Sequence, residues 1–171
     1  MYDDEFMKRA IEVSRSAIGQ PGCEPFAAVV VKDGKIVGEG LNRSLALHDP
    51  TSHGEVEAIR DACRRLGTKD LDGCDLYSSC EPCSLCVAAM HIAGISRLYY
   101  AVSLEQSWAA LKHLPQDKRR YRMTAAELRA QVGLPVGERK MPSEARRADD
   151  ARAVLQAWAE AQMGGASRPS D

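Results

Sequence analysis

The first two thirds of the chain alternate between segments with helical apolar spacing and short apolar runs typical of strands. We predict helices over residues 6–18, 56–66, 82–94 and 104–113, and strands over residues 26–32, 35–42, 75–79 and 97–102. Asp33 and Gly34, between the first two strands, favour a tight hairpin. Gly67 follows the second helix, where glycine commonly ends a helix. This alternation predicts an α/β fold, a three-layer α/β/α sandwich around a central mixed sheet.

The pattern is weaker in the C-terminal part of the chain. Between residues 115 and 142 a helix is indicated only over 124–130, and no strand is indicated. Ala151, Val154, Leu155 and Trp158 recur at helical spacing and predict a final amphipathic helix. Residues 164–171 are small and polar, which is typical of a disordered tail. We therefore expect one domain over residues 1–163 and a tail over residues 164–171.

Composition and charge restrict the class of protein. The 171 residues are 44% hydrophobic and 27% charged, a balance typical of a globular domain. A formal net charge of -1 argues against a protein that mainly neutralises phosphates. No apolar run is long enough to span a membrane. The N-terminal segment is acidic and predicted to be helical rather than a secretory signal, so we expect a cytoplasmic protein.

The cysteines are concentrated in one short segment. Three of the six lie at Cys80, Cys83 and Cys86, a density that in a reducing compartment indicates metal binding or redox chemistry. Cys83 and Cys86 are three apart in the first turn of a predicted helix, where the helix dipole favours thiolates. Together with His53 they form a typical zinc ligand set, which leaves the fourth tetrahedral position for water.

Glu55 lies two residues after His53, at a distance from which a carboxylate can transfer protons beside a metal ion without binding the ion. Two other interpretations stay open. The two cysteines are also compatible with a redox pair or with core residues. If Cys80 is a fourth ligand, the zinc site is closed and purely structural. We expect Cys80 to be packed and neutral, and Glu81 to stabilise the start of the metal helix.

His-x-Glu followed by Pro-Cys-x-x-Cys is the signature of zinc-dependent nucleobase deaminases. The chain resembles the cytidine deaminase superfamily, and within it the bacterial guanine deaminases, through residues 24–26, 42, 49–55, 58–60, 77–83 and 156–158. The resemblance implies a five-stranded sheet between helices and one zinc ion per subunit. It also implies a homodimer in which the C-terminal segment of one subunit closes the active site of its partner.

The resemblance also implies roles for individual residues. It assigns the zinc ligands to His53, Cys83 and Cys86, proton transfer to Glu55, and contacts with the base to Asn42 and Phe26. The alternative interpretations, a turn for Asn42 and core packing for Phe26, stay open. N–H groups near Gly54 and Cys83 are expected to stabilise negative charge that develops on the substrate.

Two positions depart from the guanine deaminase pattern. Gly54 matches the fungal-type cytosine deaminases, whereas the guanine branch usually has alanine. The acidic stretch that reads the purine is replaced by residues 103–108, in which Glu105 is the candidate substitute. The basic cluster formed by Lys112, His113, Lys118, Arg119, Arg120 and Arg122 is interpreted as solvated surface rather than an RNA contact.

We therefore expect hydrolytic deamination of a small-molecule nucleobase, with guanine converted to xanthine and ammonia released. The alternative substrates are cytosine or another aminopyrimidine or triazine, and then adenosine in transfer RNA. A zinc-stapled interaction domain without catalysis is the alternative from a different class.

Overall fold

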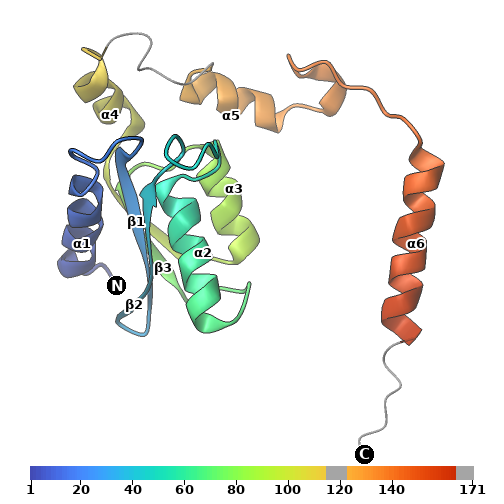
Figure 1. The fold of residues 1–171 in the computed structure, drawn as a ribbon, viewed down its shortest axis with the longest axis horizontal. Coiled ribbons are helices and arrows are strands. Elements are labelled where there is room, and N and C mark those ends of the chain that lie inside the picture. The colour runs from blue at the N-terminus through green and yellow to red at the C-terminus, as the bar shows by residue number, and fades with distance from the viewer. Residues whose placement is uncertain (115–122, 165–171) are drawn as a thin grey trace, which may run out of the picture. The chain divides into compact units, whose positions relative to one another are not determined.

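The computed structural model describes residues 1–114 and 123–164 (Figure 1). In chain order the elements are α1 (Asp4–Arg15), β1 (Glu24–Lys32), β2 (Lys35–Asn42), α2 (Gly54–Leu66), β3 (Asp75–Cys80), α3 (Ser84–Ala93), β4 (Arg97–Val102), α4 (Leu104–Leu111), α5 (Ala125–Gly133), the 3₁₀ turn η2 (Val136–Glu138) and α6 (Ala148–Gly164). By its internal contacts the chain divides into two units, Met1–Val132 and Gly133–Asp171. One domain over residues 1–163 stays a prediction, and the predicted disordered tail lies almost entirely outside the described residues.

The four strands form one mixed sheet in the order β2-β1-β3-β4. Strand β1 is antiparallel to both β2 and β3, and β3 is parallel to β4. The expectation of a fifth strand is wrong for the described residues, because every regular segment after β4 is helical. These segments are rich in alanine, glutamate and leucine and contain no run of β-branched residues, so their intrinsic preference is for helix.

Helices cover both faces of the sheet, which confirms the predicted α/β layering (Figure 1). Successive residues of a strand point to opposite faces, so β1 contributes to two cores. Val29 and Val31 pack with Met7 of α1 on one face. Ala28 and Val30 pack with residues of α2 and α3 on the other face.

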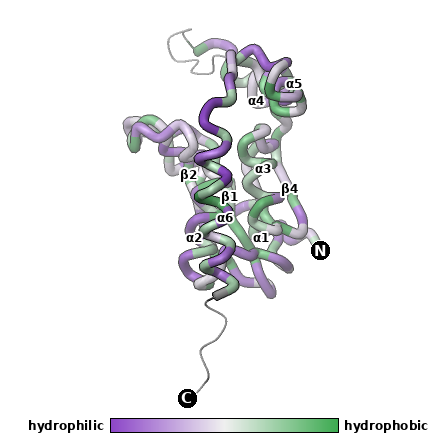
Figure 2. The backbone as a smooth tube through the Cα atoms, turned by 90° about the vertical axis from the view of Figure 1, so that its right-hand side faces the viewer, coloured by the Kyte–Doolittle hydropathy of each residue, from purple (hydrophilic) through white to green (hydrophobic). Residues whose placement is uncertain are grey.

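The hairpin and the helix ends follow the predicted turn chemistry. Asp33 and Gly34 both have positive φ angles, 49° and 70°, as a tight hairpin with a right-handed twist requires. Gly67 and Gly94 adopt the left-handed conformation that ends α2 and α3. Hydrophobic and hydrophilic stretches alternate along the described chain, and the polar stretch before α6 is the longest hydrophilic part of the C-terminal unit (Figure 2).

Helix α2 lies directly on the backbone of β1 and β2 because three glycines, Gly38, Gly40 and Gly54, allow it. A Cβ atom on Gly40 would lie 2.1 Å from the carbonyl oxygen of Gly54 and 2.2 Å from the amide nitrogen of Ala58. A Cβ atom on Gly54 would lie 2.6 Å from the carbonyl oxygen of Phe26. The close approach sets the position of His53, which immediately precedes α2.

Replacing Gly40 with alanine is expected to lower the free energy of unfolding by about 3 kcal/mol or more, since a methyl group meets rigid backbone rather than a flexible side chain. The shift in the midpoint of urea unfolding measures this effect. Gly133→Ala is the matched control, because no atom lies within 4 Å of the added Cβ. Equal stability of the two variants would contradict the packing argument.

The C-terminal unit confirms the predicted final helix as α6. Its apolar residues Val154, Leu155 and Trp158 are 69%, 68% and 64% exposed. Within its own unit, therefore, nothing covers this apolar face. No helix in the described part of the chain is both long and apolar enough to cross a bilayer.

Candidate active site

Three side chains that are far apart in the sequence meet at the starts of α2 and α3. The Nδ1 atom of His53 lies 3.5 Å from the Sγ atom of Cys83 and 3.5 Å from that of Cys86, and the two sulfurs are 3.7 Å apart. In tetrahedral zinc sites the bonds are about 2.3 Å to sulfur and about 2.0–2.1 Å to nitrogen. This geometry requires about 3.5 Å between a ligand nitrogen and a ligand sulfur, and about 3.8 Å between two ligand sulfurs. The residues present therefore fit a zinc ion.

The local fold explains this arrangement. His53 is the N-cap residue of α2 and Cys83 is the N-cap residue of α3, both with extended backbone. The predicted start of the metal helix at Pro82 is wrong, because α3 begins at Ser84. The extended backbone of Cys83 places Pro82 before the cap. Both sulfurs still belong to the helix start, where unpaired N–H groups stabilise negative charge.

The site favours the ionised form of one thiol. The contact with Cys86 lowers the pKa of Cys83 to about 4 against the opposing effect of burial, and the contact with His53 lowers it further. The same contact with Cys83 raises the pKa of His53. Because a thiolate and not a thiol binds metal, Cys83 is prepared for ligation.

Glu55 lies beside this group without belonging to it. Its side chain is buried, which raises the pKa of the carboxyl group. Ser78 donates a hydrogen bond to Oε1 at 3.2 Å, and the Cys86 thiol donates one to Oε2 at 3.3 Å. Sequence reasoning missed Ser78. The signal in the sequence is a pair of adjacent serines, Ser78 and Ser79, inside an otherwise apolar part of a predicted strand.

A cavity of about 650 Å³ opens onto the metal group. It contains the predicted residues Phe26, Asn42, His53, Glu55, Cys83 and Glu105. Gly54 and Cys86 are buried and do not line it. The rest of the wall includes apolar side chains that were not predicted: Pro50, Leu85, Leu104, Trp108, Leu111, Leu114, Met123 and Leu128.

Asn42 forms a turn and also lines the cavity. Its Oδ1 atom accepts hydrogen bonds from the backbone N–H of Ser44 at 3.0 Å and from the Ser44 hydroxyl at 2.8 Å, so the turn is present. Asn42 is 1% exposed and lines the cavity. In the described part of the chain no acceptor is found for its amide nitrogen, which leaves this donor available to a ligand.

Cys80 is buried but lies outside the group of three ligands. Burial raises the pKa of its thiol. A fourth cysteine ligand, the arrangement that closes a zinc site, is therefore absent from the group that the described residues form.

Glu81 lies in the short segment between β3 and α3, residues 81–83, which we call the metal loop, and it connects this loop to α4 and α5. Its expected role at the start of α3 stays a prediction. Its backbone N–H donates to the carbonyl of Val102 at 2.8 Å. Its carboxylate accepts a hydrogen bond from the N–H of Leu104 at 3.0 Å and lies 3.8 Å from the Arg129 guanidinium. These contacts attach the cavity wall to the loop that carries the cysteines.

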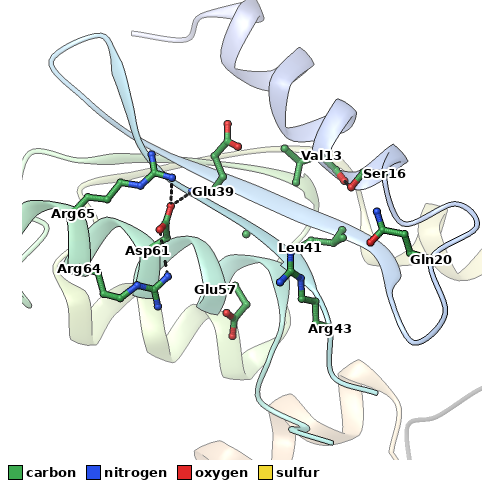
Figure 3. A pocket seen from close by; sticks show the side chains of 11 residues that line it. Val13, Ser16, Gln20, Glu39, Leu41, Arg43, Glu57, Asp61, Arg64 and Arg65 are labelled. Carbon is green, nitrogen blue, oxygen red and sulfur yellow. Dashed lines mark hydrogen bonds and ion pairs between the residues drawn. The ribbon is translucent and has the colours of Figure 1, made fainter. Parts of the chain in front are cut away.

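A second cavity, of about 350 Å³, lies between β2, α2 and the end of α1 (Figure 3). Asp61 pairs there with Arg64 at 3.3 Å and with Arg65 at 2.8 Å. The lining acids Glu39, Glu57 and Asp61 are matched by Arg43, Arg64 and Arg65. This balanced surface contains none of the metal group, so the larger cavity is the candidate site. Of the basic cluster, residues 118–122 lie outside the described residues.

The comparisons with known proteins agree with this geometry. The family model described as the cytidine and deoxycytidylate deaminase zinc-binding region matches residues 1–102. The guanine deaminase of Bacillus subtilis is 45% identical over 101 residues, which cover 59% of this chain and 65% of that protein, less than two thirds of its length. The structure of the same enzyme superposes with a TM-score of 0.80 at 32% identity, over 99% of both chains.

A tRNA-specific adenosine deaminase of Agrobacterium fabrum is 45% identical over 95 residues, which cover 56% of this chain and 62% of that protein. The structure of a guanine deaminase from Nitrosomonas europaea has a TM-score of 0.58 at 29% identity, with 64% of this chain and 63% of that chain covered. Because the family model matches more than half of the residues, the chain belongs to the cytidine and deoxycytidylate deaminase family.

Proposed function

We propose that this protein is a zinc-dependent aminohydrolase that converts a free nucleobase, guanine in the first place, to its oxo form with release of ammonia. The carrying observation is the three-residue ligand group with the buried Glu55 carboxylate beside it and outside it. Three protein ligands are typical of catalytic zinc, whereas structural zinc has four. The similarity to the guanine deaminases supports the choice of base.

His53, Cys83 and Cys86 would hold the ion, and a zinc ion held there would lower the pKa of the reacting water to about 7. Glu55 takes a proton from the attacking water and delivers it to the departing amine. The N–H groups at the starts of α2 and α3 stabilise the negative charge that develops during attack. The burial of Glu55 excludes bulk water from this transfer.

The cavity supplies the contacts for a flat heterocycle. The half-buried Phe26 offers a ring face for packing, and the Asn42 amide offers a hydrogen-bond donor. Glu105, on the first turn of α4, provides a carboxylate that can accept hydrogen bonds from a purine. A volume of about 650 Å³ lies in the range of small-molecule sites. The apolar wall favours a free base over a charged nucleic-acid strand.

Adenosine in transfer RNA is the second candidate substrate. The observation that favours it is the equal identity, 45%, to a tRNA-specific adenosine deaminase. Cytosine has less support. The position that favours it is Gly54, which matches the fungal-type cytosine deaminases, but the close packing of α2 on β1 already requires a glycine there.

A homodimer with exchange of C-terminal segments is part of the proposal. It is supported by the apolar face of α6, which its own unit leaves exposed and which a surface outside that unit can bury. Sedimentation of the full chain tests this assembly, and a monomer at micromolar concentration would contradict it.

Ammonia release from guanine, adenine, cytosine, their nucleosides and unmodified transfer RNA tests the proposed substrate. We expect kcat/KM for guanine to exceed that for each other compound by at least about 100-fold. Xanthine formation, followed by its absorbance, identifies the product. Turnover of transfer RNA but not of guanine would support the second candidate. If the zinc-loaded protein released no ammonia from any of these compounds, the proposal that it is an enzyme would be overturned.

A further inference from the structure

We propose that Ser78 is a positioning residue for Glu55, an inference that rests on the proposed deaminase function. The Ser78 hydroxyl lies 3.2 Å from Oε1 of Glu55. Ser78 is 1% exposed and Glu55 is 6% exposed, so water cannot readily replace the contact. Ser78 belongs to β3 and Glu55 to α2, so this hydrogen bond joins the sheet to the helix that carries the carboxylate.

The surroundings of Ser78 direct its single hydroxyl proton toward Glu55. The backbone N–H of Cys80 donates to the Ser78 Oγ atom at 3.4 Å, so the oxygen already accepts a hydrogen bond. The other acceptor within reach is the carbonyl of Ala27, at the longer distance of 3.5 Å. A hydrogen bond to a carboxylate is stronger than one to a neutral carbonyl. Ser78 therefore acts as a donor to Oε1.

This donor matters because the other side-chain contact of Glu55 involves a proposed zinc ligand. Oε2 accepts from the Cys86 thiol, and a cysteine that ligates zinc is a thiolate without a proton to donate. Among the described side chains, Ser78 is thus the donor to Glu55 that is independent of ligation. The last torsion of a glutamate is itself loosely restricted, and the backbone N–H of Glu55 is a further donor to the carboxylate. With Oε1 held by Ser78, Oε2 stays directed toward the metal group.

The position of Ser78 predicts a separation between turnover and binding. Ser78 does not line the cavity, whereas Phe26 and Asn42 do. Loss of the hydroxyl should therefore disturb proton transfer, which requires close alignment, and leave contacts with the base intact.

The experiment compares Ser78→Ala with Ser79→Ala in the full-length zinc-loaded protein. Ser79 is the matched control, because its hydroxyl is also buried but bonds the backbone N–H of Ala27 instead of Glu55. For Ser78→Ala we expect kcat for guanine to fall about 10- to 100-fold, the usual effect of removing a hydrogen bond to a charged group. KM is expected to change less than about twofold, because the substrate contacts of the cavity are retained. Ser78→Thr, which keeps the hydroxyl, should restore most of kcat.

Two readouts do not depend on activity. Metal analysis should show the same zinc content in both alanine variants and the wild type. A crystal structure of Ser78→Ala should show the Glu55 carboxylate rotated or in two orientations. An active wild type with equal kcat in both alanine variants would overturn the inference. If the wild type turns over no base in the panel, the proposed function fails, and the carboxylate orientation in the crystal still decides the role of Ser78.

Discussion

Replacement of Glu55 with glutamine is expected to reduce kcat by about 10²- to 10⁴-fold, the range for loss of a general acid–base group. Glutamine has nearly the same shape as glutamate and can accept the hydrogen bond that Ser78 donates. It cannot take up or release the proton that deamination requires. Ammonia release under saturating substrate measures the loss, and metal analysis should show unchanged zinc content, because Glu55 is not in the ligand group.

Glu57→Gln is the matched control for this variant. Glu57 lies on the same helix two residues later, but it pairs with Arg60 and lines the second cavity rather than the candidate site. The control should keep wild-type kcat. Near-normal turnover of Glu55→Gln would exclude the proton-transfer role. If Glu55→Gln instead contained less zinc than the control, its loss of activity would point to a structural role of Glu55.

Replacement of Cys83 with alanine is expected to lower the zinc content to near zero and to abolish detectable turnover. The variant removes one of three protein ligands, and the two remaining donors, His53 and Cys86, form an incomplete site. Because a metal that binds only the folded state stabilises it, the variant should also unfold at a lower temperature than the zinc-loaded wild type. Metal analysis and thermal unfolding measure the two effects.

Cys80→Ala separates ligation from packing in this experiment. Cys80 is buried at the end of β3, three residues before Cys83, but lies outside the ligand group. The variant is expected to bind zinc at the wild-type stoichiometry. If Cys80→Ala lost zinc as completely as Cys83→Ala does, the site would have four ligands and the account of an open catalytic position would be wrong.

The ligand group and Glu55 could be predicted from the sequence because they consist of two pairs of residues, each close together in the chain. His53 and Glu55 are two residues apart, and Cys83 and Cys86 are three apart, so one helix start holds each pair whatever the rest of the fold does. The hairpin at Asp33 and the helix ends were predictable for the same reason, since turn chemistry depends on a few neighbouring residues.

The sequence by itself thus determined the layered α/β pattern, the donor set for the metal and the carboxylate beside it. Only the tertiary structure decided that four strands pair in the described chain, that Ser78 contacts Glu55, and that Glu81 attaches α4 and α5 to the metal loop. Apart from the β1–β2 hairpin, these features join residues more than twenty positions apart. Periodicity reports which face of an element is apolar, but it carries no information about which distant element lies against that face.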